Sequence, residues 1–422
     1  MPLPSDFLSL AQAQHLHLHA QGLAHAPAAK ASPARLVKAI EQMRLLQIDT
    51  INVVNRSPYL VLYSRLGHFP LHWLEQVLAQ GKIFEVWAHE ASFAITTDFA
   101  ELHANLNDRS HFGQRLAQKA IALHGPQMQL LLEHIRANGP VRSSDFERPL
   151  DVERPKAGWW SWKAEKRWLE AWFATGKLMV AQRDKFQRVY DLTERVHPAS
   201  QQIKLPDRET IKSVFIENSV RALGVTPARW VHDYYRIKPR LRDKDMTSFV
   251  EQGLFLEVEV EHQTEPWYVH RDHVKTLKSI VSAKALPPTH CAILSPFDPI
   301  VWDRQRAEEF FNFKYRIECY TPETKRRYGY FVLPILLEGA IIGRLDAKAH
   351  RSVNAIDGVF EVKGLWLEDG IKATEVLAQK LVHLLIDFAR WHGCEQLIIQ
   401  DCVPKNFSAM LKKLTKKKHR DD

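Results

Sequence analysis

The chain has few cysteines and no long apolar run. Its 422 residues include four cysteines, which stand far apart and form no C-x-x-C pair. Such scarcity argues against a disulfide scaffold and a structural zinc site, and it favours a reducing compartment, so we expect a cytoplasmic protein. No apolar run reaches the ~18 residues of a transmembrane helix, and the N-terminus lacks a signal-peptide pattern. We therefore predict no membrane partner.

The sequence also lacks the short motifs of several enzyme classes. It contains no G-x-x-x-x-G-K-[ST], no helix-opening G-x-G-x-x-G, no G-x-S-x-G and no H-E-x-x-H. ATPases, Rossmann dehydrogenases, classical hydrolases and zinc peptidases therefore have no support. His15, His17 and His19 alternate, but the leucines between them favour an amphipathic helix, on which the three rings scatter. We expect no metal and no other cofactor.

The charge balance is basic. The formal net charge is +9 at pH 7, which fits an anionic partner, with nucleic acid as the leading candidate. Part of the excess comes from the lysine-rich run 412–418, for which a solvated chain end is an alternative explanation. The rest of the chain remains mildly basic without that run.

Local patterns predict an α+β chain. Ser32 and Pro33 begin a helix, and extended stretches follow at 83–88 and 91–96. Residues 127–200 give a helix, a turn, a helix and two strands, the order of a winged helix, and residues 209–270 repeat it. From about residue 289 the pattern is β-rich, with a hairpin turn at Glu338–Gly339 and a helix over 373–391.

These patterns divide the chain into four predicted domains. The first is an N-terminal winged-helix domain at 1–125 that carries the candidate site. A second winged-helix domain at 126–205 and a third at 206–288 follow. Residues 289–422 form the β-rich domain.

One polar pair stands out in the stretch "RLLQIDTINVVNRSPYLVLYSRLG". Gln47 and Asp49 flank Ile48 in an apolar frame, and in an extended segment residues i and i+2 point to the same side. A carboxylate beside an amide can hold one water molecule and stabilise nearby positive charge, which suits hydrolysis through a cationic sugar. The alternative is structural: Asp49 caps a helix starting near Ile51, and Gln47 satisfies buried backbone.

Several segments together resemble one known family, the bacterial crosslink-repair DNA glycosylases of the AlkZ/YcaQ family. The similarity covers about residues 5–400 and is greater to the YcaQ branch. The family's signature is Gln–apolar–Gln in one branch and Gln–apolar–Asp in the other, and Gln47–Asp49 has the second form. The segments that carry the resemblance are "RLLQIDTINVVNRSPYLVLYSRLG", "VWAHEASF", "LSPFDPIVWDRQRAEEFFNF", "ECYTPETKRRYGYFVLPILLEGAIIGRLDAKAHR" and "LWLEDGIK".

The resemblance implies a fold and an activity. The fold would be a C-shaped scaffold of tandem winged-helix domains followed by a β-barrel-like domain. The activity would be hydrolysis of the N-glycosidic bond of N7-alkylguanine in double-stranded DNA, including unhooking of interstrand crosslinks. Asp49 would be the catalytic carboxylate and Gln47 its water-positioning partner. We expect a monofunctional, monomeric base excision repair enzyme at the nucleoid.

Further residues are candidates for DNA contact or for the pocket. Arg56, Tyr59 and Arg65 follow the polar pair closely; the alternative is that Tyr59 is core and the arginines are solvated. The pocket candidates, with buried structural roles as the alternative, are Trp87, His89 and Glu90.

Two more segments combine positive charge with aromatic rings. The segment Lys325, Arg326, Arg327 and Tyr328 precedes the predicted hairpin, and the family probes DNA with a hairpin of its β-barrel. A second cluster consists of Trp159, Trp160 and Trp162 with Lys163, Lys166 and Arg167; a core role is the alternative to a stacking surface.

Two other classes of function stay open from the residues alone. A winged-helix transcription regulator would bind duplex DNA and release no base, but it has no need of a polar pair in an apolar frame. An RNA-processing hydrolase is the third reading.

Overall fold

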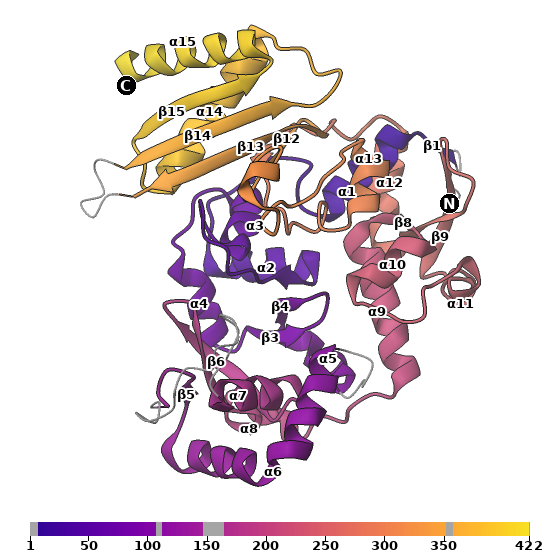
Figure 1. Ribbon diagram of the computed structural model, residues 1–422. Coiled ribbons are helices and arrows are strands. Elements are labelled where there is room, and N and C mark those ends of the chain that lie inside the picture. Colours follow the sequence, from indigo (N-terminus) through magenta and orange to yellow (C-terminus); the bar gives the residue numbers. More distant parts are fainter. Residues whose placement is uncertain (1–6, 107–111, 147–163, 352–357, 422) are drawn as a thin grey trace. The chain divides into compact units, whose positions relative to one another are not determined.

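The computed structural model describes residues 7–106, 112–146, 164–351 and 358–421 (Figure 1). The chain divides into two compact units, Met1–Phe69 with Glu217–Asp422, and Pro70–Ile216. This grouping joins the N-terminal segment to the C-terminal half, whereas our four domains follow the chain in order, and their boundaries stay a prediction. The mixture of helices and strands confirms the α+β class.

The first unit holds the N-terminal elements and everything from the end of α9 onward. Helix α9 (Arg208–Leu223) crosses the boundary between the units. The other elements are β1 (Phe7–Leu8), α1 (Leu10–Ala20), α2 (Pro33–Met43), β2 (Leu46–Gln47), α3 (Ser57–Leu66), β8 (Val225–Pro227), α10 (Ala228–Tyr234), η3 (Asp243–Asp245), α11 (Thr247–Glu251), β9 (Phe255–Val260), β10 (Trp267–His270), η4 (Arg271–His273), α12 (Val274–Val281), β11 (Cys291–Ile293), α13 (Arg304–Phe311), η5 (Glu323–Lys325), β12 (Leu333–Leu337), β13 (Ala340–His350), β14 (Val359–Leu367), α14 (Glu375–Trp391), β15 (Gln396–Val403) and α15 (Lys405–Asp421).

Two sheets organise this unit. One has the strand order β1-β9-β10-β8, in which β1 pairs in parallel with β9. The other has the order β11-β12-β13-β14-β15, and its strands β13, β14 and β15 run side by side in Figure 1. Strand β15 joins β14 in parallel after the crossover helix α14, as parallel pairing requires.

The expected β-barrel is not found among the described residues. The five strands form an open sheet in which β11 and β15 are the two edges. The physical reason is the parallel last strand, because its helical crossover returns β15 beside β14 instead of toward β11. Helix α15 then packs against β15 and α14.

The second unit contains two small antiparallel arrangements. Strands β3 and β4 form a hairpin, and β5, β7 and β6 form a sheet in that order. Its elements are α4 (His72–Ala79), β3 (Ile83–Trp87), β4 (Ala91–Ile95), η1 (Thr96–Asp98), α5 (Phe99–Asn105), α6 (Phe112–Asn138), β5 (Val141–Arg142), α7 (Ala164–Ala174), β6 (Leu178–Asp184), β7 (Gln187–Leu192), α8 (Thr193–Val196) and η2 (Pro198–Gln201).

A buried charge network connects four elements of the second unit. Glu85 on β3 accepts hydrogen bonds from Arg183 on β6 and from Arg188 on β7, at 2.5–2.9 Å. Arg188 also pairs with Glu170 on α7. Burial alone would raise the pKa of Glu85, but the two arginines hold it below its ordinary value. The ionised network therefore stabilises this unit.

Helix α3 is fixed by residues far away in the sequence. Arg65 is 7% exposed and donates two hydrogen bonds to Asp298, at 2.6 and 3.0 Å. At the other end of α3, the hydroxyl oxygens of Ser57 and Ser295 lie 2.8 Å apart. Both partners belong to the segment "LSPFD", so that segment holds the helix that follows the candidate site.

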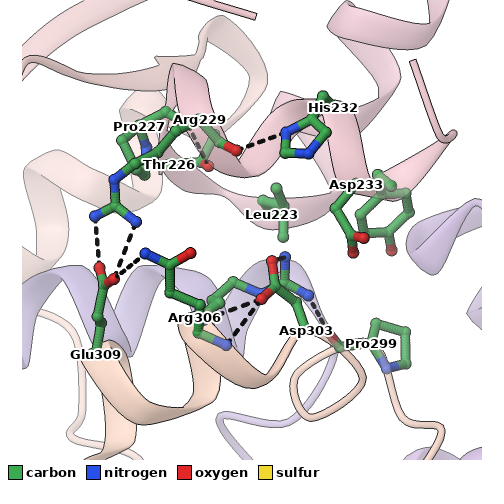
Figure 2. Close-up of polar contacts among 12 residues, drawn as sticks. Leu223, Thr226, Pro227, Arg229, His232, Asp233, Pro299, Asp303, Arg306 and Glu309 are labelled. Atoms are coloured by element: carbon green, nitrogen blue, oxygen red, sulfur yellow. Dashed lines mark hydrogen bonds and ion pairs between the residues drawn. The ribbon is translucent and has the colours of Figure 1, made fainter. Parts of the chain in front are cut away.

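Helix α13 in turn supports the segment around Asp298. Figure 2 shows Arg306 reaching the carbonyl oxygen of Pro299, at 2.5 Å, and the carboxylate of Asp303. The same helix is tied to α10, because Arg229 donates to both carboxylate oxygens of Glu309. These contacts, together with the burial of Arg306, place the Asp298 carboxylate for its ion pair.

Candidate active site

The polar pair predicted from the sequence lies in a non-helical stretch between β2 and α3. Gln47 ends β2, and α3 begins only at Ser57, with Arg56 as its N-cap. Asp49 therefore caps no helix, although its Oδ1 accepts the backbone N–H of Ile51 at 2.8 Å. The alternative in which Asp49 caps a helix starting near Ile51 is wrong, because residues 48–56 form no helix.

Asp49 keeps one oxygen for other partners. Its side chain is half-buried, and within the described ranges only Oδ1 makes a hydrogen bond. Burial raises the pKa of Asp49, and the Ile51 N–H opposes that rise. A carboxylate with a raised pKa and a free oxygen is suited to accept a proton or to face a developing positive charge.

Gln47 has an unsatisfied acceptor. Its side chain is 7% exposed, and Oε1 is buried without a hydrogen-bond partner in the part of the chain that the structure describes. An unpaired buried acceptor costs about 1–3 kcal/mol. The alternative in which this amide satisfies buried backbone therefore does not account for Oε1.

Two residues that the sequence did not mark lie within electrostatic reach of Asp49. Burial, and then the charge of Asp49, raise the pKa of Cys319. Cys319, burial and Asp49, in that order, raise the pKa of Tyr320. Both residues lie inside "ECYTPETKRRYGY", where only the basic run drew attention. Their electrostatic interaction with Asp49 could not be predicted from local sequence patterns, because the residues stand about 270 positions apart in the chain.

The basic segment after them divides into exposed and supporting side chains. Lys325 and Arg327 are exposed, whereas Arg326 and Tyr328 are half-buried. Arg326 donates from Nε to the carbonyl of Thr321, and the Tyr328 ring lies under other side chains of the sheet. Lys325 and Arg327 are thus the two of the four whose side chains are exposed.

The three DNA-contact candidates that follow the polar pair differ in burial. Arg56 is half-buried at the start of α3. Tyr59 is 5% exposed, and Arg65 is buried against Asp298. The core alternative therefore describes Tyr59, and Arg65 has a structural role in place of a DNA contact.

The other pocket candidates belong to the second unit. Trp87 ends β3 half-buried, His89 is buried and Glu90 is exposed in the turn before β4. Their membership of one pocket with Asp49 stays a prediction. The candidates Trp159, Trp160, Trp162 and Lys163 lie outside the described residues.

The described ranges contain no candidate metal site and no candidate membrane span. No three His, Cys, Asp or Glu side chains there are grouped so as to hold a metal ion. None of the helices described has the length and apolar character needed to cross a bilayer.

Residues 40–391, which include the polar pair and the basic segment, match the family model described as DNA glycosylase AlkZ-like. The chain belongs to this family and is a DNA glycosylase, an enzyme of DNA repair that acts on DNA. The Streptomyces sahachiroi DNA glycosylase AlkZ has a similar fold: the TM-score is 0.55 at 15% identity, over 93% of this chain and 99% of that chain.

Proposed function

We propose that this glycosylase hydrolyses the N-glycosidic bond of N7-alkylguanine in DNA, and that it also unhooks interstrand crosslinks made through N7. The observation that carries the proposal is the polar pair. Among the described residues, the Asp49 carboxylate has one oxygen without a hydrogen bond, and the buried amide oxygen two residues before it has no partner. Its Gln–apolar–Asp form fits the YcaQ branch of the family.

The chemistry of the lesion explains why so few groups suffice. N7 alkylation makes the guanine cationic, so the base departs without a general acid. As the C1′–N9 bond breaks, its electron pair goes to the base and positive charge develops on the sugar. Asp49 stabilises that charge, and Gln47 Oε1 accepts one hydrogen of the water that attacks C1′. Asp49 receives the other proton of the water as the new C–O bond forms.

We propose simple hydrolysis that leaves an abasic site. A glycosylase that also cuts the strand uses an amine to form a Schiff base with the sugar. No lysine occurs in residues 44–67, the segment that holds the polar pair. The product in this proposal is therefore free alkylguanine and an intact strand with a missing base.

The proposed DNA contacts combine two exposed side chains with one half-buried side chain near the polar pair. Lys325 and Arg327, with Arg56 near the polar pair, would bind phosphates. The element orders α6-β5-α7-β6-β7 and α9-β8-α10-α11-β9-β10 support two winged helices. We propose that the protein acts as a monomer on the bacterial nucleoid. In an open scaffold of winged-helix domains, a base that is tethered to the opposite strand need not rotate into a closed pocket.

The test is release of base from two defined substrates. Wild-type protein is expected to release 7-methylguanine from methylated duplex DNA and to unhook a nitrogen-mustard crosslink. Asp49→Asn keeps the shape of the side chain and removes its charge, so we expect release to fall about 10²–10⁴-fold while duplex binding survives. Unchanged release by Asp49→Asn would remove the carboxylate from the mechanism. Sequence-selective footprinting with no release on either substrate would favour a regulator instead.

A further inference from the structure

Helix α15 lies outside the part of the chain that the family model matches. The match ends at residue 391, whereas α15 spans Lys405–Asp421 and packs against β15 and α14 (Figure 1). The lysine-rich run 412–418 begins within this helix, so its first residues belong to a packed helix instead of a loose chain end. Membership of the family therefore assigns no role to α15, and its role is inferred from its own side chains.

One face of α15 is buried, and the opposite face carries lysines. Phe407 and Leu411 are fully inaccessible, and Thr415 is 6% exposed. These three positions are spaced by four residues and therefore line one side of the helix. At ~100° per residue, four lysines fall on the opposite side, within about 100° of one another. We call them the lysine face, and all four are exposed: Lys405, Lys412, Lys413 and Lys416.

The lysine face is fixed to the sheet, and its charge is available to a partner. Lys412 donates a hydrogen bond from Nζ to the carbonyl oxygen of Gln400 on β15, at 2.9 Å. No Asp or Glu occurs in the sequence between Lys405 and Lys416. Among the described residues, no carboxylate forms an ion pair with Lys405, Lys413 or Lys416.

The lysines do not stabilise the helix that carries them. Lys405 stands at the first position of α15, where the helix macrodipole favours an anion and disfavours a cation. None of the four lies in the last turn, where a cation would be favoured. Lys416 follows Lys412 by four positions and Lys413 by three, and like charges at these spacings repel. An anionic partner would relieve these repulsions, so the function of the lysine face lies with a partner.

The length of the lysine face suits a row of phosphates. Lys405 and Lys416 are 11 positions apart, which corresponds to ~16 Å along the helix. Phosphates on one strand of B-DNA follow one another at ~3.4 Å along the axis, so the face spans about five of them. Lysine is a point charge on a flexible stem, which suits phosphate contacts that read no base sequence. Because the protein is a DNA glycosylase, duplex DNA is the polyanion on which it acts.

From these observations we propose that the lysine face of α15 binds the phosphate backbone of undamaged duplex DNA. It gives the enzyme an affinity for DNA that does not depend on a lesion. The lysines contact no reacting group, and they hold the protein on the duplex by charge alone. This inference goes beyond the proposed function, because it requires only that the protein acts on DNA and not that it removes a particular base.

The test is the salt dependence of binding to an undamaged duplex. The full-length wild type is compared with a triple variant, Lys405→Gln, Lys413→Gln and Lys416→Gln, by fluorescence anisotropy between about 50 and 200 mM salt. Each phosphate contact contributes about 0.9 to the slope of log affinity against log salt. Over this fourfold range the wild type should therefore lose at least about threefold more affinity than the variant, the value for one contact. The value for three contacts is about 40-fold.

Two further triple variants separate the lysine face from net charge. Arginine at the three substituted positions should retain the wild-type salt dependence, because the charges stay in place. The matched control removes three lysines that are exposed elsewhere in the first unit, and it should also keep nearly the wild-type dependence. All variants should unfold at the wild-type temperature, because the replaced side chains are exposed. The control substitutions are Lys30→Gln, Lys275→Gln and Lys284→Gln.

Three results would overturn the proposal. The first is a wild-type salt dependence in the glutamine variant of the lysine face. The second is an equal loss of salt dependence in the matched control, which would assign the effect to net charge. The third is that the glutamine variant no longer binds phosphatidylglycerol vesicles but binds DNA as wild type does, which would assign the face to a membrane surface. The duplex contains no lesion, so failure of the proposed base release leaves every one of these results readable.

Discussion

Replacing Gln47 by methionine should make the protein more stable and less active. Methionine has nearly the size and reach of glutamine, but it places no amide oxygen in the buried position. Because Oε1 has no partner within the described residues, its removal should relieve the ~1–3 kcal/mol that an unsatisfied buried acceptor costs. At about 2–4 °C per kcal/mol for a domain of 150–250 residues, the melting temperature should rise by roughly 2–12 °C.

The same substitution should slow base release. If Oε1 orients the attacking water, its loss leaves the water misplaced, and misplacement of a reacting group by about 1 Å costs on the order of 10²-fold in rate. We therefore expect Gln47→Met to reduce single-turnover release of 7-methylguanine about 10²-fold. The two measurements are thermal unfolding by circular dichroism and release at saturating enzyme.

Gln21 provides the matched control. This buried glutamine donates from Nε2 to the carbonyl of Ala222 at 2.6 Å, and it is fully inaccessible. Gln21→Met should lower the melting temperature, because it leaves that carbonyl unpaired. If Gln47→Met lowers the melting temperature as Gln21→Met does, then Oε1 has a structural partner and the reasoning about the site is refuted. An unchanged release rate would refute the role of the water.

Three further predictions concern other charged and strained positions. Because the pKa of Asp49 is raised, enzymatic release, corrected for spontaneous depurination, should fall with acidification at a pH above the ordinary range of aspartate, and a profile with the ordinary pKa would contradict this. Because the pKa of Glu85 is lowered, its ionised form contributes stability above the ordinary pKa of glutamate, and this stability is lost as the pH falls through the lowered pKa. Glu85→Gln should leave Arg183 with no buried counter-charge. We therefore expect the free energy of unfolding, measured in urea at pH 7, to fall by about 3–5 kcal/mol. Gly329→Ala should displace the loop of residues 318–330, since the glycine has φ +140° and lies against Asp346. Weaker duplex binding in fluorescence anisotropy, with the fold retained, is the result that checks this.

Local features of the fold were predictable because local rules produce them. The hydroxyl of Ser32 accepts the N–H of Arg35, and Pro33 opens α2, as expected for a helix start. The hairpin turn at Glu338–Gly339 is confirmed, with positive φ at both positions. The helix predicted at the start of residues 127–200 is instead part of α6, which begins at Phe112 and has a break at His124 before Pro126. Proline is common at the start of a helix, but Pro126 lies inside α6 and accompanies a kink in it.

Features that depend on distant parts of the chain were not predictable from spacing. Arg65 has the charge of a DNA contact, but its partner Asp298 stands 233 positions away and keeps it buried. Tyr320 stands in a sequence context that fits a core or a surface residue equally, and the structure shows that its ring is exposed. The open sheet has the same origin, since no pattern within β15 tells whether it pairs with β14 or β11.

The polar groups of the candidate site therefore come from one short segment, whereas the residues that hold this segment in place come from distant parts of the chain. Gln47 and Asp49 are two positions apart, so one short strand and its continuation supply both polar groups. The segment that follows them is held at Val54, whose carbonyl accepts a hydrogen bond from Arg351, and at Ser57, which meets Ser295. Both partners come from the C-terminal half of the chain. Substitutions at Arg351 or Ser295 should thus change base release through the position of Asp49 without changing any group that the reaction uses.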